Sequence, residues 1–462
     1  MIGRVLVANR GEIARRIFRA CRELGIATVA IYGAGEARAP HVREADDAYR
    51  IDAKPSTLPY LDVESIVAVA RRAGADAIHP GYGFLAENPT LARASDEAGL
   101  VFIGPSAEAI RAMGDKVGAR AIAAQAGVPI VPGSEGPIKS AEEAAKWAKH
   151  HGYPVALKAS GGGGGRGFRV AKNADQLAGA FAGAAGEAER SFANPAIYVE
   201  RYIPAPRHIE IQLFADGAGN IVSLGERECS IQRRHQKLIE ESPSPAVDPR
   251  LRQRLGEAAT ALAGAVDYRG AGTVEFLLDD QGNFYFLEMN TRIQVEHTVT
   301  EMVTGIDLVK EQFLVASGHN LSFGVKDVAP RGHAIECRIN AEDAGRGFAP
   351  APGVLGHYRE PSGFGIRVDA ALEAGGEVLP AYDSLIAKLI VWGRDRAEAI
   401  ARMQRALADF TITGLPTTIP FHQAVMSHPA FQEGNTTTAF LEDHPDVFSL
   451  PPSPSRVDGP GQ

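Results

Sequence analysis

The stretch "RVLVANRGEIARRIFRACRELGIATVAIYG", residues 4–33, decides the fold of the first region of this chain. It begins with an apolar run at 5–8 that is typical of a buried strand. Four apolar residues then recur at helical spacing: Ile13, Ile17, Cys21 and Leu24. Gly25 is a helix stop signal, and a second apolar run follows at 27–32. A strand, a helix and a strand in this order predict a parallel sheet covered by helices.

The same alternation continues to about residue 113. The pattern predicts a helix over 63–74 and strands within 75–83 and 100–106. Residues 1–113 are therefore predicted to form a Rossmann-like N-terminal domain. The turn after the first strand reads Asn-Arg-Gly instead of G-x-G-x-x-G, so the dinucleotide-binding fingerprint is absent.

Residues 114–330 have a different pattern. Five glycines at 161–165 stand between two predicted strands, "YPVALKAS" and "FRVAKN", which favours a hairpin with a lid-like loop over a linker between domains. Strict alternation in "HIEIQLFA" places His208, Glu210 and Gln212 on one face of a strand. The stretch "AGTVEFLLDDQGNFYFLEMN" predicts two further strands around an Asp-Gln-Gly-Asn turn.

The last region is predicted to be an α+β domain over 331–446. Residues 447–462 are rich in Pro, Gly and Ser and are predicted to form a disordered tail. The fold class is therefore α/β in the first region and α+β in the rest.

Charge and cysteine content narrow the class of function. Lys and Arg number 48 against 56 Asp and Glu, which gives a net charge of -8. This balance argues against a nucleic-acid or membrane-surface partner, because both favour a basic protein. The three cysteines lie far apart, so neither a disulfide framework nor a CxxC metal site is expected. No secretory signal or membrane-spanning stretch is recognised, and we expect a cytoplasmic protein.

The stretch "EMNTRIQVEH", residues 288–297, is the most informative for chemistry. If it is a strand, five polar residues share one face: Glu288, Asn290, Arg292, Gln294 and Glu296. A solvated edge strand would have the same pattern. Glu275 in the preceding predicted strand favours a site, because two carboxylates and an amide oxygen suit Mg²⁺ or Mn²⁺. Arg292 offers a planar fork for a carbonate-like anion, and Glu296 is a candidate base.

A group of cations lies in "ECSIQRRHQKLIEESPSP", where the sequence predicts a loop with Arg233, Arg234, His235 and Lys237. A solvated charged loop is the ordinary explanation for such a run. An anion site opposite a metal site is, however, what phosphoryl transfer requires. Lys116 and Lys158 add two further positive charges.

Taken in order along residues 2–445, these stretches resemble the biotin carboxylase family of ATP-grasp ligases. The resemblance rests on "VLVANRGEIA", "HPGYGFLAEN", "GDKV", "LKASGGGGGRG", "QRRHQK", "EMNTRIQVEHTVTE" and "ECRINAED". It implies a pre-ATP-grasp domain, an ATP-grasp domain over 114–330 with a glycine-rich lid at about 131–203, and a C-terminal domain.

The resemblance also implies the reaction. Bicarbonate would be joined to biotin through carboxyphosphate, with ATP and Mg²⁺ or Mn²⁺. The residues implied to bind ATP are Lys116, Lys158, Gly164, Gly165, Glu200, Arg201, Tyr202, Ile203, His208, Gln232, His235, Glu275 and Glu288. The implied metal ligands are Glu275, Glu288 and Asn290.

Bicarbonate and biotin have their own implied residues. Those for bicarbonate are Lys237, Arg292, Gln294 and Val295. Glu296 would be the general base, Arg338 would stabilise negative charge on biotin, and Tyr82 would help to hold its ring. The chain departs from the family pattern at Arg201 and Phe168, where lysine and methionine are common.

The expected setting is a multi-part carboxylase. No Met-Lys-Met biotin attachment site and no carboxyltransferase-sized segment are present, so a separate biotin carboxyl carrier protein and a carboxyltransferase are expected as partners. Acetyl-CoA carboxylase of fatty acid synthesis is the preferred setting, and propionyl-CoA, pyruvate and 2-oxoglutarate carboxylases are alternatives. A homodimer is expected from the family.

Two other interpretations are a carbamoyl-phosphate synthetase-like ligase, which would show a repeat, and a silent scaffold. The scaffold would lack at least one of five residues that are all present: Glu275, Glu288, Arg292, Glu296 and Arg338.

Overall fold

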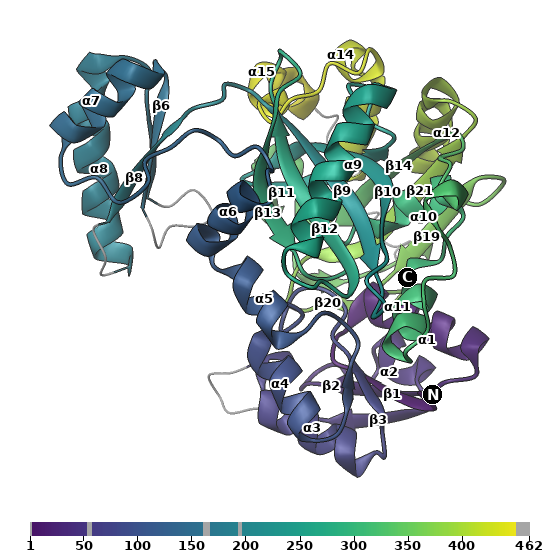
Figure 1. The fold of residues 1–462 in the computed structure, drawn as a ribbon. Coiled ribbons are helices and arrows are strands. Elements are labelled where there is room, and N and C mark those ends of the chain that lie inside the picture. Colours follow the sequence, from purple (N-terminus) through teal and green to yellow (C-terminus); the bar gives the residue numbers. More distant parts are fainter. Residues whose placement is uncertain (1, 53–57, 160–166, 193–195, 450–462) are drawn as a thin grey trace.

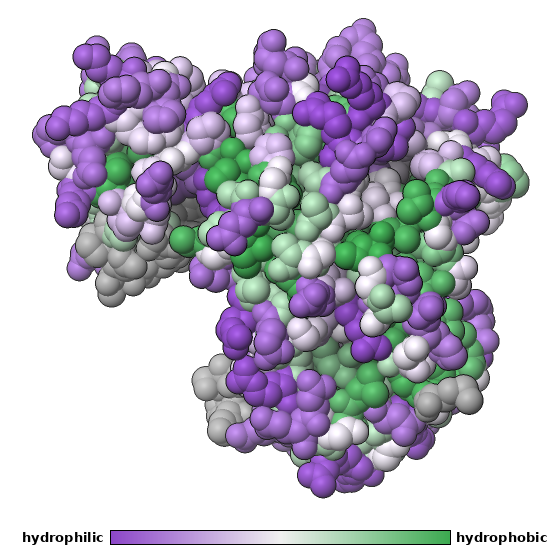
Figure 2. Space-filling model, viewed as in Figure 1, coloured by the Kyte–Doolittle hydropathy of each residue, from purple (hydrophilic) through white to green (hydrophobic). Residues whose placement is uncertain are grey.

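The computed structural model describes residues 2–52, 58–159, 167–192 and 196–449. Figure 1 shows a main body, an N-terminal region below it and a small unit that stands apart to one side. Figure 2 shows a notch between the small unit and the N-terminal region, and mostly polar residues over the outer surface of both. Within the described residues, every helix is too short or too polar to cross a membrane.

The N-terminal region is a five-stranded parallel sheet, as predicted. Its strands are β1 (Arg4–Val7), β2 (Ala27–Tyr32), β3 (Asp47–Arg50), β4 (Ala77–His79) and β5 (Val101–Phe102). Their order is β3-β2-β1-β4-β5. The principal helices of this region are α1 (Gly11–Leu24), α3 (Val63–Arg72) and α4 (Pro89–Glu97). Helix α1 ends at Gly25, whose φ of 70° is the left-handed conformation that glycine adopts without strain.

The small unit is the region that the sequence assigned to the lid. It contains α7 (Ala141–His151), β6 (Val155–Ala159), β7 (Phe168–Ala171), α8 (Ala174–Phe192) and β8 (Ile197–Arg201). Strands β6 and β7 are antiparallel, with Lys158 opposite Phe168, which confirms the predicted hairpin. Gly164 and Gly165 lie outside the described residues.

The main body is built on one eight-stranded sheet. Its order is β13-β12-β9-β10-β11-β14-β21-β19. The first five members are β13 (Phe284–Asn290), β12 (Gly270–Leu278), β9 (Arg207–Ala215), β10 (Ile221–Arg233) and β11 (Gln236–Ser242). The others are β14 (His333–Asn340), β21 (Leu385–Gly393) and β19 (Ile366–Ala370). Strands on both sides of residue 330 thus share one sheet, which brings side chains of both sequence regions onto one face.

Helices cover the two faces of this sheet differently. On one face, Ile209, Ile211 and Leu213 pack in the same apolar cluster as α9 (Pro249–Gly264). On the other face, α10 (His297–Thr304) packs against β10, β11, β14 and β21. The polar residues that alternate with the isoleucines in β9 therefore point away from α9, as the sequence predicted.

The remaining elements are shorter or peripheral. The helices are α2 (Pro40–Glu44), α5 (Ala107–Gly114), α6 (Lys116–Gln125), α11 (Leu308–Ala316), α12 (Arg396–Asp409), α13 (Ile419–Ser427), α14 (Pro429–Gln432) and α15 (Phe440–Asp443). The strands are β15 (Glu342–Asp343), β16 (Ala349–Pro350), β17 (Gly353–Val354), β18 (Tyr358–Arg359), β20 (Glu377–Val378) and β22 (Thr411–Ile412).

The prediction that 288–297 forms one strand is wrong. Strand β13 ends at Asn290, and α10 begins at His297. The chain leaves the sheet because the Thr291 N–H donates to the Glu87 carboxylate, 3.0 Å away, instead of continuing the ladder. Strand β13 also contains a β-bulge: Glu275 pairs with Glu288 and Phe276 with Phe286, so Leu287 is an extra residue. Because of this extra residue, the Glu288 side chain does not share the strand face of Phe284 and Phe286.

The predicted tail begins too early. Val447 is buried, and the Phe448 ring stacks on Phe421 with centroids 6.0 Å apart. Both residues therefore belong to the folded C-terminal region, because each buries apolar surface against it. Residues 450–462 lie outside the described part of the chain.

Candidate functional site

Lys237 lies at the centre of the main cluster of predicted site residues. Its Nζ donates to Glu210 Oε2 at 2.5 Å, Glu275 Oε1 at 2.8 Å and Glu296 Oε1 at 2.6 Å. The sequence placed Lys237 in a loop, but it belongs to β11, because the connection consists of only Arg234 and His235. Both connecting residues have positive φ, so the tight hairpin leaves the lysine within the ladder.

The charges in this cluster determine one another's pKa values. Burial alone would lower the pKa of Lys237, but its three carboxylate neighbours raise it well above the ordinary value. Burial would raise the pKa of Glu275 and of Glu296. Lys237 outweighs that effect for both, with help from His208 at Glu275 and from Arg338 at Glu296, so both pKa values lie below the ordinary value. Lys237, Glu275 and Glu296 are therefore charged near neutral pH.

Arg227 is a site residue that the sequence analysis missed. Its guanidinium is fully buried and donates to Gln212 Oε1 at 2.6 Å and to Gln294 Oε1 at 2.9 Å. It also pairs with Glu210 and with two threonine hydroxyls. The available signal was the charged triplet Glu-Arg-Glu at 226–228, within a segment that reads as a strand. Arg227 fixes the carboxylate and amide groups that surround Lys237.

His208 joins this cluster, and His235 does not. His208 Nε2 lies 3.0 Å from Glu275 Oε2, and Gln232 Nε2 lies 3.4 Å from His208 Nδ1. Burial would lower the pKa of His208, but the Glu275 charge raises it above the ordinary value. His235 is exposed at the tip of the hairpin. Its neighbour Arg233 lies over the Phe348 ring, 4.9 Å from the centroid.

The predicted nucleotide residues of the small unit form a second group. Lys158 Nζ pairs with Glu200 Oε2 at 2.5 Å. The backbone N–H groups of Arg201 and Tyr202 donate to proline carbonyls, each at 2.9 Å, and Ile203 is buried. Glu200 therefore fixes the lysine that the sequence assigned to ATP, while the Arg201 and Tyr202 N–H groups are already used within the protein.

Glu275 and Glu288 are the two carboxylates that the sequence assigned to a divalent cation. They lie directly opposite each other on β12 and β13. Burial and the Glu275 charge raise the pKa of Glu288, against the lowering effect of Lys116 at the start of α6. Among the described residues, none donates a hydrogen bond to Glu288 or forms an ion pair with it. Lys237 and His208 already partner Glu275, so Mg²⁺ or Mn²⁺ would bind this pair only once Glu275 exchanges them.

Asn290, the third predicted metal ligand, is engaged elsewhere. Its Oδ1 accepts from Arg292 Nη2 at 2.9 Å, and its Nδ2 donates to Glu275 Oε1 at 2.9 Å. Arg292 also pairs with Glu87 Oε2 at 2.9 Å. Glu87 was not predicted as a site residue, although it lies in "HPGYGFLAEN". Arg292 must therefore exchange these partners before its fork can take an anion.

Arg338 connects Glu296 to a further buried carboxylate. Its Nη2 lies 3.0 Å from Glu296 Oε2, and its Nε donates to Glu240 Oε1 at 2.7 Å. These acids raise the pKa of Arg338 although burial opposes them. Gln294 Nε2 donates to Glu275 Oε1 at 2.9 Å, and the Val295 carbonyl accepts from Lys388 at 2.8 Å. The structure thus brings together the predicted residues of β11, β14 and the 291–296 loop.

Tyr82 lies apart from this cluster, at a cavity of about 140 Å³ between the N-terminal region and the C-terminal region. The lining includes Glu12, Tyr82, Phe84, Asp383 and Leu385. The Tyr82 hydroxyl donates to Glu12.

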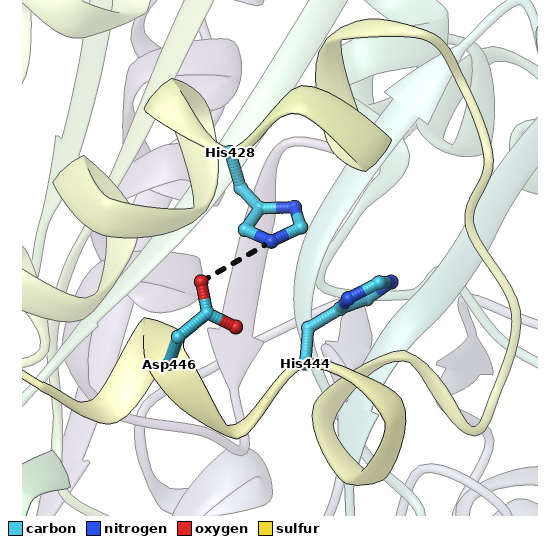
Figure 3. A group of neighbouring side chains, drawn as sticks. All are labelled: His428, His444 and Asp446. Carbon is cyan, nitrogen blue, oxygen red and sulfur yellow. Dashed lines mark ion pairs between the residues drawn. The ribbon is translucent and has the colours of Figure 1, made fainter.

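A separate group of possible metal ligands, His428, His444 and Asp446, lies in the last helices (Figure 3). His428 Nδ1 accepts the Ala430 N–H at 3.2 Å and so caps α14. Its Nε2 therefore carries the proton and faces Asp446 Oδ2 at 3.3 Å. A metal ion bound at Nε2 would require the proton on Nδ1. The observed tautomer therefore makes His428 a helix cap that also faces Asp446, and not a metal ligand.

Facing carboxylates, a lysine held among three acids and a small unit beside an antiparallel sheet are features expected of an ATP-grasp ligase. Residues 115–323 match the family described as "Carbamoyl-phosphate synthase L chain, ATP binding domain". Residues 1–110 match "Biotin carboxylase, N-terminal domain", and residues 336–443 match "Biotin carboxylase C-terminal domain". The chain belongs to the biotin carboxylase family.

Similar proteins carry the names of different parent enzymes. The chain is 55% identical to Biotin carboxylase 1 of Bacillus subtilis, over 96% of this chain and 99% of that protein. A crystal structure of the biotin carboxylase component of pyruvate carboxylase is 52% identical and superposes with a TM-score of 0.87. The match covers 97% of this chain and 99% of that one.

A crystal structure of the biotin carboxylase domain dimer of Hydrogenobacter thermophilus 2-oxoglutarate carboxylase, in complex with MgADP, ADP and bicarbonate, superposes with a TM-score of 0.91. It is 51% identical and covers 97% of this chain and 99% of that one. The predicted family, fold class and ligase activity are confirmed.

Proposed function

We propose that this chain carboxylates biotin on a separate carrier protein, with bicarbonate and ATP, as the first half-reaction of acetyl-CoA carboxylase. The observation that supports it best is the position of Glu296 between two cations. Lys237 lies 2.6 Å from one carboxylate oxygen and Arg338 lies 3.0 Å from the other. Such an array offers a base and two anion-binding groups within one small volume.

In the proposed mechanism, bicarbonate takes over donors that now serve the protein. Lys237 and Arg292 turn from carboxylates to the substrate anion, which Gln294 and the Val295 N–H also contact. As Lys237 turns away from Glu296, the pKa of Glu296 rises, since Lys237 is the strongest cause of its lowering. The carboxylate then becomes a better base at the moment when it must take the bicarbonate proton.

The nucleotide site is proposed to lie between the small unit and the sheet. Its residues are Lys116, Lys158, Gly164, Gly165, Glu200, Arg201, Tyr202, Ile203, His208, Gln232 and His235. Glu275 and Glu288 would hold Mg²⁺ or Mn²⁺, joined by Asn290 once Arg292 releases its oxygen. When bound, the ion neutralises phosphate charge. The Hydrogenobacter domain was crystallised with MgADP and bicarbonate, which supports these ligands here.

Biotin is proposed to enter on the side of Arg338 and Tyr82. Arg338 would stabilise negative charge on the ureido oxygen, an oxyanion-type role for a guanidinium held by Glu240. The partners are a biotin carboxyl carrier protein, a carboxyltransferase and a second copy of the chain. Pyruvate and 2-oxoglutarate carboxylases are the second candidate setting, because relatives with those names are about as similar as the biotin carboxylases.

The test is ATP hydrolysis with Mg²⁺, measured with and without bicarbonate and then with free biotin. Hydrolysis should require bicarbonate, rise with biotin and collapse in Glu296→Ala. The exposed Glu442→Ala is the matched control, and it should retain the wild-type rate. Hydrolysis that is independent of bicarbonate would contradict the mechanism. Labelled bicarbonate transferred to carriers from acetyl-CoA and from pyruvate carboxylases would then distinguish the two settings, since the cognate carrier should be carboxylated faster.

A further inference from the structure

Lys388, in the middle of β21, has an unusual position for a lysine. Its side chain is completely buried. Its Nζ donates to the Val295 carbonyl at 2.8 Å and lies 3.3 Å from Glu12 Oε1. It also lies 5.9 Å from the centre of the Tyr82 ring. One ammonium group of the C-terminal region therefore reaches residues of both other regions of the sequence.

Glu12 extends this contact to Tyr82. It is the second residue of α1, and its Oε1 receives both the Lys388 ammonium and the Tyr82 hydroxyl. Its other oxygen, Oε2, is buried without a hydrogen-bond partner among the described residues. Burial raises the pKa of Glu12 to about 7, against the lowering effect of Lys388. A continuous path thus runs from the Val295 carbonyl through Lys388 and Glu12 to the Tyr82 hydroxyl.

The burial of this ammonium does not by itself explain the stability of β21. Its neighbours along the strand are apolar: Ile386, Ala387, Leu389 and Ile390. A buried ion pair often stabilises a fold no more than apolar residues of similar size. The charge at 388 is therefore better explained by what it holds than by the burial itself.

What Lys388 holds is the loop that ends in the catalytic carboxylate. Val295 directly precedes Glu296, and the bond to its carbonyl fixes the peptide plane between these two residues. The Val295 N–H, on the other side of the residue, is the one proposed to contact bicarbonate. At the opposite end of the path, Tyr82 lies in the wall of the cavity on the proposed biotin side.

We propose that Lys388 is a positioning residue that holds the loop at 291–296, here called the bicarbonate loop, and Tyr82 in one fixed relation, through Val295 on one side and Glu12 on the other. This inference rests on the proposed function, because it uses the bicarbonate and biotin assignments. Its consequence is that the two substrate subsites are coupled. A change at the tyrosine end alters bicarbonate binding, and a change at the lysine alters biotin binding, although neither side chain is proposed to touch that substrate.

The charged residues around Lys388 determine which variants can test the proposal. Asp369 faces it from β19, Glu336 and Arg338 extend from β14, and Glu12 comes from α1. Removing the ammonium alone leaves Glu12 without its cation, which destabilises the fold. Lys388→Met is therefore paired with Glu12→Gln/Lys388→Met, in which both partners of the ion pair are neutral.

The experiment measures kcat and the KM values for bicarbonate and biotin in biotin-dependent ATP hydrolysis, with thermal melting of each variant. In the double variant both KM values should rise about tenfold or more, since a 1.4 kcal/mol loss of positioning corresponds to a factor of about ten. A purely structural role would lower the melting temperature and leave both KM values unchanged, which would overturn the proposal. Lys326→Met, at an exposed lysine, is the matched control and should change nothing.

Tyr82→Phe tests the proposal independently if the lysine variants do not fold. It removes only the hydroxyl that reaches Glu12, from a half-buried ring. The KM for bicarbonate should rise severalfold, and an unchanged value would refute the coupling. Wild-type protein without bicarbonate-dependent hydrolysis would instead contradict the proposed function, so the two failures are distinguishable.

Discussion

Replacement of Lys237 by methionine tests the electrostatics of the site most directly. Methionine has a similar length and no charge, so the three carboxylates within 2.8 Å of the ammonium lose their shared cation. Breaking a buried ion pair from one side costs about 3–5 kcal/mol. The lower end is expected here because Arg227 still neutralises Glu210, and Arg338 still neutralises Glu296.

The pH dependence of the unfolding free energy tests this electrostatic explanation more specifically than the total loss of stability. In the wild type the lowered pKa values of Glu275 and Glu296 contribute stability above the unfolded pKa of about 4.3, and this is lost as the pH falls through the folded values. Without Lys237, burial is opposed only by His208 at Glu275 and by Arg338 and Arg227 at Glu296, and we expect burial to prevail at Glu275 and raise its pKa. The variant should then lose stability as the pH rises from about 5, by up to about 1.4 kcal/mol per pH unit for each carboxyl that remains protonated.

The assay is denaturant unfolding of wild type and Lys237→Met at pH 5 and pH 8. The difference in unfolding free energy should be at least about 2 kcal/mol larger at pH 8. Lys326→Met, an exposed lysine, controls for the substitution itself and should show no difference at either pH. A penalty that is equal at both pH values would refute the reasoning, because it would mean that Lys237 does not control the ionisation of its neighbours.

Two further predictions concern other buried parts of the fold. Burial raises the pKa of Glu240 to about 8 and that of Glu336 to about 7, and the two lie opposite each other on β11 and β14. A raised carboxyl pKa makes stability fall between about pH 4.3 and pH 7, so Glu336→Gln should flatten that fall, measured by unfolding at pH 5 and pH 8. An unchanged slope would show that Glu336 is not protonated in the fold. Truncation after Ser449 should leave the melting temperature unchanged, whereas truncation after His444 removes Phe448 and the buried residue before it and should cost roughly 3 kcal/mol. Equal melting of the two truncations would contradict the packing of the last residues.

Local patterns in the sequence predicted much of the fold. The run at 4–33 predicted β1, α1 and β2, because apolar spacing and a glycine stop are properties of the segment itself. The alternation in "HIEIQLFA" correctly placed His208 and Glu210 on one face of the strand, and the structure shows that this face lies away from α9. The family could be recognised because several short motifs occur in a fixed order along the chain.

Other features depended on contacts between distant segments. The sequence extended a strand through 288–297, but the Glu87 carboxylate, more than 200 positions away, ends it by taking the Thr291 N–H. The roles of Arg227 and Lys388 could not be predicted either, because a charged residue in a strand reads as exposed until its partners are known.

The sequence by itself determined the order of most elements and the class of chemistry, and it proposed most of the residues of the candidate site. Only the tertiary structure decided which of them meet. It placed Lys237 among three carboxylates, left His235 at an exposed hairpin tip and linked Tyr82 to the 291–296 loop through Glu12 of its own region and Lys388 of the C-terminal region. The physical reason is that periodicity records only whether a side chain faces inward. The partner that satisfies a buried charge is chosen by the pairing of strands far apart in the chain.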